Sequence, residues 1–84
     1  MFVVYSKPAC SHCEQAKSLL KTKGIDFEVV HLDVGQPKID GEKYIARDEL
    51  LLKVPGARTM PQIFKDEVPI GGFTELKALL LNAA

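Results

Sequence analysis

The chain has two cysteines, and both lie in one short segment, Cys10-Ser11-His12-Cys13. Before this segment, residues 2–5 form a β-branched and aromatic run that predicts a strand. Residues 11–23 follow, and their apolar side chains recur at the spacing of a helix. The pair of thiols therefore stands where a strand passes into a helix, and any fold of this chain has to place it at the start of that helix.

The remaining apolar pattern predicts further strands, a hairpin and two more helices. The predicted strands are residues 2–5, 26–32, 62–65 and 68–70, and the predicted helices are residues 11–23, 40–53 and the segment that begins at Thr74. Asp40 and Thr74 are the predicted N-caps of the second and third helices. The order β-α-β-α-β-β-α predicts a parallel β-α-β unit followed by an antiparallel hairpin. We therefore expect an α/β fold with a four-stranded mixed sheet flanked by three helices.

Length and composition restrict the class of protein. A chain of 84 residues predicts one domain over residues 1–84, and its 46% hydrophobic and 26% charged residues are typical of a globular protein. Eleven basic and eleven acidic residues give a net charge of zero, which disfavours a nucleic-acid partner. The apolar runs are too short to span a membrane, and no secretory signal is visible. We therefore expect a cytoplasmic protein, in which a close cysteine pair is catalytic or metal-binding.

The position of the pair predicts two different roles for the two thiols. Unpaired N–H groups and the partial positive charge at a helix N-terminus favour a thiolate and lower a thiol pKa. Cys13 shares an apolar stripe with Ala16 and Leu20 and should point inward, whereas Cys10 lies at the exposed start of the helix. We therefore predict that Cys10 attacks a disulfide and that Cys13 resolves the mixed disulfide.

A zinc site is the alternative use of such a pair. Structural zinc takes four ligands, and beyond the two cysteines the chain offers only His12 and His31 as further soft ligands. No second paired motif is present. The redox hypothesis is therefore favoured, and no metal is expected.

Four motifs resemble, in order and in spacing, the short dithiol glutaredoxins of bacteria and their phages. They are Tyr5-Ser6-Lys7, Cys10-Ser11-His12-Cys13, Arg58-Thr59-Met60-Pro61-Gln62-Ile63-Phe64 and Ile70-Gly71-Gly72-Phe73-Thr74-Glu75. The resemblance covers almost the whole chain and implies a single glutaredoxin domain with a thioredoxin-like fold. It also implies a glutathione-dependent thiol–disulfide oxidoreductase, in which glutathione is the reductant or the mixed-disulfide partner.

The resemblance implies a glutathione-binding set of residues. The set is Lys7, His12, Arg58, Thr59, Met60, Pro61, Gly71, Gly72, Phe73, Thr74 and Glu75. Pro61 is implied to be cis, which would turn the backbone of Met60 toward the cysteines, where it could pair with glutathione as an added strand. The side chain of Met60 could instead belong to the core.

For other residues of this set, a structural or surface role is the alternative to glutathione binding. The two glycines either allow a ligand to approach closely or form a bulge that ends the last strand. The start of the last helix would receive the γ-glutamyl carboxylate and Glu75 the ammonium, although many family members have aspartate there. Lys7 and Arg58 would attract the glutathione anion, or each is a solvated surface cation.

Between the cysteines, this chain has Ser11-His12 where the family commonly has Pro-Tyr. A protonated His12 would stabilise the Cys10 thiolate, or the ring is exposed and uncommitted. Ser11 resembles glutaredoxins that hold a [2Fe–2S] cluster between two protomers with glutathione, so a cluster carrier is the alternative function. A redoxin that is reduced by a flavoprotein reductase is a third hypothesis, which Lys7, Thr59 and residues 71–74 disfavour.

The expected partners are glutathione and client proteins that contain a disulfide or a glutathionylated thiol. Ribonucleotide reductase is a common client of the family, but no residue of this chain selects it. We expect a monomer.

Overall fold

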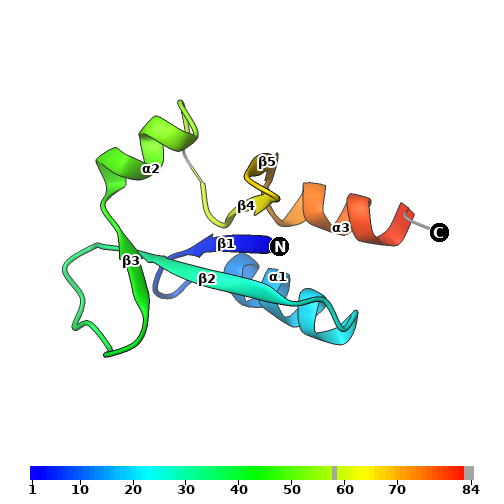
Figure 1. Cartoon of the computed structure of the whole chain (residues 1–84), viewed down its shortest axis with the longest axis horizontal. Helices are drawn as coiled ribbons and strands as arrows, with labels where there is room; N and C mark the ends of the chain where they lie inside the picture. The colour runs from blue at the N-terminus through cyan, green and yellow to red at the C-terminus, as the bar shows by residue number, and fades with distance from the viewer. Residues whose placement is uncertain (58, 83–84) are drawn as a thin grey trace.

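The computed structural model describes residues 1–57 and 59–82 (Figure 1). In chain order the elements are β1 (Phe2–Ser6), α1 (Ser11–Thr22), β2 (Phe27–Leu32), β3 (Lys43–Ile45), α2 (Arg47–Lys53), β4 (Gln62–Lys65), β5 (Val68–Gly71) and α3 (Phe73–Asn82). No helix in the described part of the chain is long and apolar enough to cross a membrane.

The strands form one mixed sheet in the order β3-β2-β1-β4-β5, with β1 at its centre. β1 pairs in parallel with β2, so that Phe2 lies opposite Phe27, and antiparallel with β4, so that Phe2 lies opposite Lys65. β4 and β5 form an antiparallel hairpin whose turn residues Asp66 and Glu67 both have positive φ angles, 50° and 69°. Two positive φ angles are typical of the type I′ turns that match the twist of a hairpin. The parallel β-α-β unit and the hairpin are therefore confirmed.

The sheet has five strands, one more than the sequence predicted, because the start of the predicted second helix is wrong. Residues 43–45 form β3, which pairs in parallel with β2, and Ile45 is buried there. The helix α2 begins only at Arg47, and its N-cap is Ala46 rather than Asp40. Backbone pairing with β2 and burial of a β-branched side chain outweigh a weak helical pattern in this segment.

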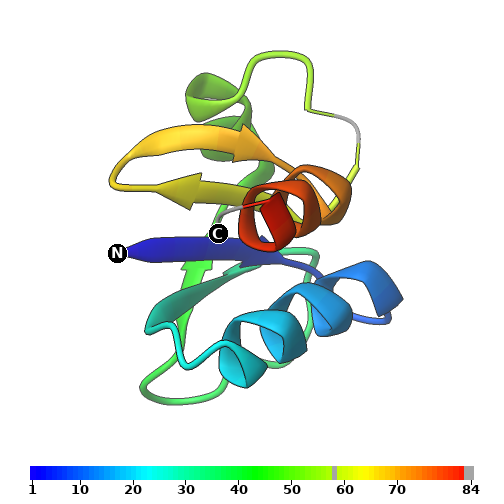
Figure 2. The same ribbon diagram turned by 90° about the vertical axis from the view of Figure 1, so that its right-hand side faces the viewer.

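The strands bury their side chains alternately on the two faces of the sheet. Phe2 and Val4 of β1 pack with Leu20 of α1 and Leu76 of α3 in one core cluster. Tyr5 belongs to a second cluster, with Phe64 and with Leu50 of α2 among its members. Because side chains of a strand alternate between faces, α1 and α3 cover one face together, and the short α2 contributes to the other. Figure 2 shows α1 and α3 side by side.

Candidate functional site

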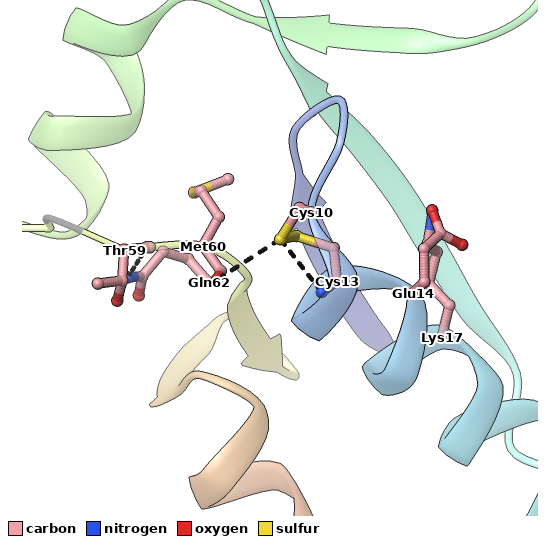
Figure 3. Close-up of a disulfide and its surroundings, with 7 residues drawn as sticks. All are labelled: Cys10, Cys13, Glu14, Lys17, Thr59, Met60 and Gln62. Carbon is pink, nitrogen blue, oxygen red and sulfur yellow. Dashed lines mark hydrogen bonds and ion pairs between the residues drawn. A yellow bond between two sulfur atoms is a disulfide. The ribbon is translucent and has the colours of Figure 1, made fainter.

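The two cysteines form a disulfide at the N-terminus of α1 (Figure 3). Their Cα atoms are 5.3 Å apart. Cys10 is the N-cap residue of the helix in an extended backbone conformation, and its Sγ atom accepts the backbone N–H of Cys13 at 3.2 Å. An N-cap side chain normally supplies an oxygen for this purpose. In the dithiol state the same N–H would favour the thiolate of Cys10, because hydrogen bonding to a charged form stabilises it.

The two sulfur atoms differ in exposure, as the sequence predicted. Cys13 is fully buried on the stripe that also buries Ala16 and Leu20, whereas Cys10 is half-buried at the start of the helix. A reagent in solution can therefore reach Cys10 but not Cys13.

The segment before β4 faces the disulfide. The Met60–Pro61 peptide bond is cis, which agrees with what the resemblance implied. The carbonyl oxygen of Met60 lies 3.7 Å from the Sγ atom of Cys10, and Figure 3 shows it pointing at that atom. Gln62 donates from Nε2 to the carbonyl of Thr59 at 2.7 Å and so holds the same segment in place. Met60 therefore presents backbone to the reactive sulfur.

The side chain of Glu75 caps the start of α3. Its Oε1 atom accepts the backbone N–H of Gly72 at 2.7 Å, and the N–H of Leu76 donates to the carbonyl of Gly72 at 3.0 Å. This is the Glu-to-N-cap half of a capping box. The prediction that Thr74 is the N-cap of this helix is wrong, because the helix already begins at Phe73.

Little space surrounds the two glycines before α3. A Cβ atom on Gly71 would lie 2.6 Å from Oε1 of Glu75, and one on Gly72 would lie 3.3 Å from the carbonyl oxygen of Pro61. Gly71 also has a φ angle of 115°, and a register shift near Ile63 disturbs the β4–β5 ladder. Close approach and an irregular strand end therefore both occur here.

A pocket of about 240 Å³ lies between these segments. It is lined by His12, Thr59, Met60, Pro61, Gly72, Phe73, Thr74 and Glu75. The imidazole ring of His12 stacks on the ring of Phe73, with the ring centroids 6.0 Å apart and the planes at 15°. Three separate parts of the chain thus meet at one cavity beside Cys10: the start of α1, the segment before β4 and the start of α3.

Two residues of the predicted glutathione-binding set, Gly71 and Lys7, do not line this pocket. Gly71 supports Glu75 but is not among the lining residues of this pocket. Lys7 is exposed and lines a neighbouring pocket, which also contains Arg47 of α2. Arg58 lies outside the described residues. Sequence reasoning missed Arg47 because it placed this residue inside a longer helix, and no motif marks it.

The second histidine, His31, does not line the pocket beside the disulfide. His31 of β2 lies 3.5 Å from a carboxylate oxygen of Glu42, and its ring contacts the ring of Tyr44. Within residues 1–57 and 59–82, no group of three or more His, Cys, Asp or Glu side chains could hold a metal ion.

The amino-acid sequence is similar to a known protein family. A family model described as Glutaredoxin matches residues 2–70. Glutaredoxin 3 of Escherichia coli K12 is 40% identical over 76 residues, which cover 90% of this chain and 81% of that protein. These matches include the cysteine pair and the segment before β4.

Solved structures agree with the arrangement of the elements. Glutaredoxin 1 from Francisella tularensis, complexed with cacodylate, superposes with a TM-score of 0.69 at 30% identity, covering 96% of this chain and 95% of that one. A buckwheat glutaredoxin–glutathione complex superposes with a TM-score of 0.68 at 28% identity, covering 96% of this chain and 69% of that one. The expected thioredoxin-like fold is confirmed by these neighbours.

Proposed function

Because the chain belongs to the glutaredoxin family, whose members are thiol–disulfide oxidoreductases, we propose that it uses glutathione to reduce protein disulfides and glutathione mixed disulfides. One observation carries the proposal: the half-buried sulfur of Cys10 lies beside the backbone of Met60 at the pocket between His12 and the start of α3. The glutathione complex of the buckwheat protein, which shares the fold, supports glutathione as the ligand.

The catalytic cycle follows from the exposure of the two sulfurs. The Cys10 thiolate attacks one sulfur of a client disulfide and forms a mixed disulfide, and the second client sulfur leaves as a thiol after taking a proton. Cys13 then attacks the sulfur of Cys10, which forms the Cys10–Cys13 disulfide and releases the client as a dithiol. Two electrons have passed from the cysteine pair to the client.

Two molecules of glutathione restore the dithiol. The first attacks the sulfur of Cys10, and Cys13 leaves as a thiol. The second attacks the glutathione sulfur of the mixed disulfide, so that oxidised glutathione departs and Cys10 becomes a thiolate again. A client that is already glutathionylated needs only Cys10 and a second glutathione.

The pocket offers complementary groups to glutathione. The backbone of Met60 lies beside the sulfur of Cys10, and an extended tripeptide would pair with it in the manner of an added strand. The N-terminus of α3 suits the γ-glutamyl carboxylate. Glu75 uses one carboxylate oxygen for Gly72, which leaves Oε2 as an acceptor for the ammonium. Lys7 contributes positive charge nearby, because it precedes Cys10 by three residues.

Two cysteine variants test the proposal. Cys10→Ser should abolish the glutathione-dependent reduction of a small mixed disulfide, such as that of mercaptoethanol and glutathione. Cys13→Ser should retain this activity and lose the reduction of protein disulfides, because only the latter require an internal resolving thiol. Substantial turnover by the Cys10→Ser variant would overturn the proposal.

The [2Fe–2S] carrier stays a prediction that rests on Ser11, at the first position of α1. Anaerobic reconstitution with iron, sulfide and glutathione would test it, and a colourless monomer would contradict it. A cytoplasmic location and a role toward ribonucleotide reductase are further proposals. A pull-down from cell extract with the Cys13→Ser variant, which retains clients as mixed disulfides, would identify the clients directly.

A further inference from the structure

Gln62 is a buried polar residue that the catalytic cycle above does not use. It is the first residue of β4, where it lies opposite Tyr5 of the central strand β1, and it directly follows the cis Met60–Pro61 bond. Its Nε2 atom donates to the carbonyl oxygen of Thr59 at 2.7 Å, so the side chain bridges the whole cis-proline segment (Figure 3). A strand of the sheet thus carries the donor, and such a rigid element places a side chain precisely.

This hydrogen bond fixes the direction of the Thr59–Met60 peptide. The cis bond of the segment is Met60–Pro61, and the preceding peptide is trans and planar, so that its N–H points opposite to its C=O. Because the carbonyl of Thr59 points at the buried amide of Gln62, the N–H of Met60 points away from that amide. Among the residues that the structure describes, no acceptor pairs with this N–H, and no other donor reaches the carbonyl of Thr59.

We propose that Gln62 is a positioning residue, whose amide holds the Thr59–Met60 peptide so that the N–H of Met60 donates to a backbone carbonyl of the substrate's cysteine. The carbonyl of Met60 lies 3.7 Å from the Sγ atom of Cys10, so this residue is next to the place where a mixed disulfide forms. Without the amide, the peptide has to be ordered when the substrate binds, which weakens binding.

The inference rests on the proposed function and deepens it, because it names the substrate class. Gln62 favours disulfides of cysteine, which carry a peptide backbone, over disulfides of thiols that have none. A side chain that only stabilised the fold would not distinguish these two classes. The distinction is therefore the readout that separates positioning from a structural role.

The experiment compares two disulfides in a single turnover, without glutathione. Oxidised N-acetylcysteine methylamide has a peptide group on each side of its cysteine, whereas oxidised mercaptoethanol has none. The protein is reduced, freed of reductant and mixed with either disulfide, and mass spectrometry after an acid quench gives the second-order rate constant. Cys10 attacks one sulfur and releases the first thiol, and Cys13 then attacks Cys10 and releases the second. Each turnover forms one protein disulfide and two small thiols.

Gln62→Met keeps the length of the side chain and fills the buried site with apolar atoms, but it removes the donor. Its rate constant with the cysteine disulfide should fall about two- to tenfold, the range that corresponds to one hydrogen bond. The rate constant with oxidised mercaptoethanol should stay at the wild-type value. Alkylation of Cys10 by iodoacetamide should also be unchanged, because its sulfur accepts the N–H of Cys13 and no group of Gln62. Gln62→Asn, whose amide is one methylene shorter, repeats the test with a polar side chain and should lose the same selectivity.

Gln36→Met is the matched control. Gln36 also donates from Nε2 to a backbone carbonyl, that of Leu32 at 3.0 Å, but it does so in the loop after β2. Its variant should lower the unfolding free energy and leave both rate constants unchanged. Equal losses on the two disulfides in the Gln62 variants, or no loss on either, would overturn the positioning role alone. If the wild type reduces neither disulfide, the proposed function fails together with it.

Discussion

Glu75 reaches back across the first turn of α3, where its Oε1 atom accepts the backbone N–H of Gly72 at 2.7 Å. The carboxylate thereby satisfies an N–H that the helix itself cannot pair. It also lines the pocket beside the disulfide. One side chain thus fixes the start of the helix and presents negative charge to the proposed ammonium of glutathione.

Two substitutions separate these functions of Glu75. Glu75→Gln keeps an acceptor of the same length and should leave the unfolding free energy nearly unchanged, while the loss of charge raises the KM for glutathione. Glu75→Ala should raise that KM as well and should also lower the unfolding free energy by about 1 kcal/mol, because the N–H of Gly72 loses its partner. Urea unfolding and steady-state kinetics measure the two effects. Equal stability of both variants would contradict the capping role.

Gly71→Ala should destabilise the protein by about 1–3 kcal/mol, the usual cost of a side chain in a sparsely populated backbone region. Its Cβ atom would also displace Glu75 from Gly72, because it would lie 2.6 Å from Oε1. Gly35→Ala is the control, since its φ angle is also positive, 86°, but no atom lies within 4 Å of the added Cβ. Only Gly71→Ala should raise the KM for glutathione. A KM at the wild-type value would show that the position of Glu75 does not matter for the ligand.

His12→Ala should raise the KM for a glutathione mixed disulfide by about two- to tenfold, the range that corresponds to the loss of one aromatic pair. The ring of His12 stacks on Phe73 and lines the pocket, so its removal loosens one wall. His12→Phe preserves the stack and should retain most of the affinity. If the Phe variant loses as much as the Ala variant, the ring nitrogens of His12 matter rather than the stack.

The protein should remain folded when the disulfide is reduced, because the core does not depend on it. Leu20, Ile63 and Leu76 are fully buried in the cluster between the sheet and helices α1 and α3. Closing a loop of only four residues contributes about 2 kcal/mol in the chain-entropy description. Urea unfolding with and without dithiothreitol should therefore show two cooperative transitions that differ by about that amount. A non-cooperative transition in the reduced state would contradict this expectation.

Asp33 should give the stability a specific pH dependence. The backbone N–H of Gly35 and the ammonium of Lys38 hold the pKa of Asp33 below its ordinary value of 3.8. A carboxyl group whose pKa is lowered by folding stabilises the protein above the unfolded pKa, and this contribution is lost as the pH falls through the folded pKa. Asp33→Asn should therefore be less stable than the wild type at about pH 6, and the difference should shrink as the pH falls below 3.8. A difference that persists at the lower pH would show that the ion pair is not its origin.

The elements around the disulfide were predictable because their signals are local. The stripe of α1 shows in the spacing of Cys13, Ala16 and Leu20, and these are the residues that the helix buries. The Asp66-Glu67 turn follows from two short apolar runs in sequence. The burial difference between the two cysteines follows from the same helical geometry.

The second helix and the start of the third were predicted less well. Residues 43–45 carry a pattern that suits either a helix or a strand, and only pairing with β2, which lies eleven or more residues earlier in the chain, decides between them. Thr74 is a suitable N-cap by residue type. The approach of Glu75 to Gly72 nevertheless places the N-cap two residues earlier, and α3 begins at Phe73.

By itself, the sequence determined the order of the three helices and of four of the five strands, the reactive pair and the family resemblance, because helical spacing, turn residues and the Cys-x-x-Cys motif act over a few residues. Only the tertiary structure decided the fifth strand, the stack of His12 on Phe73 and the presence of Arg47 and Lys7 at one pocket. These features join residues that are 40 to 61 positions apart or depend on strand pairing. Contacts over such separations form only when the whole core is buried, and no local pattern encodes them.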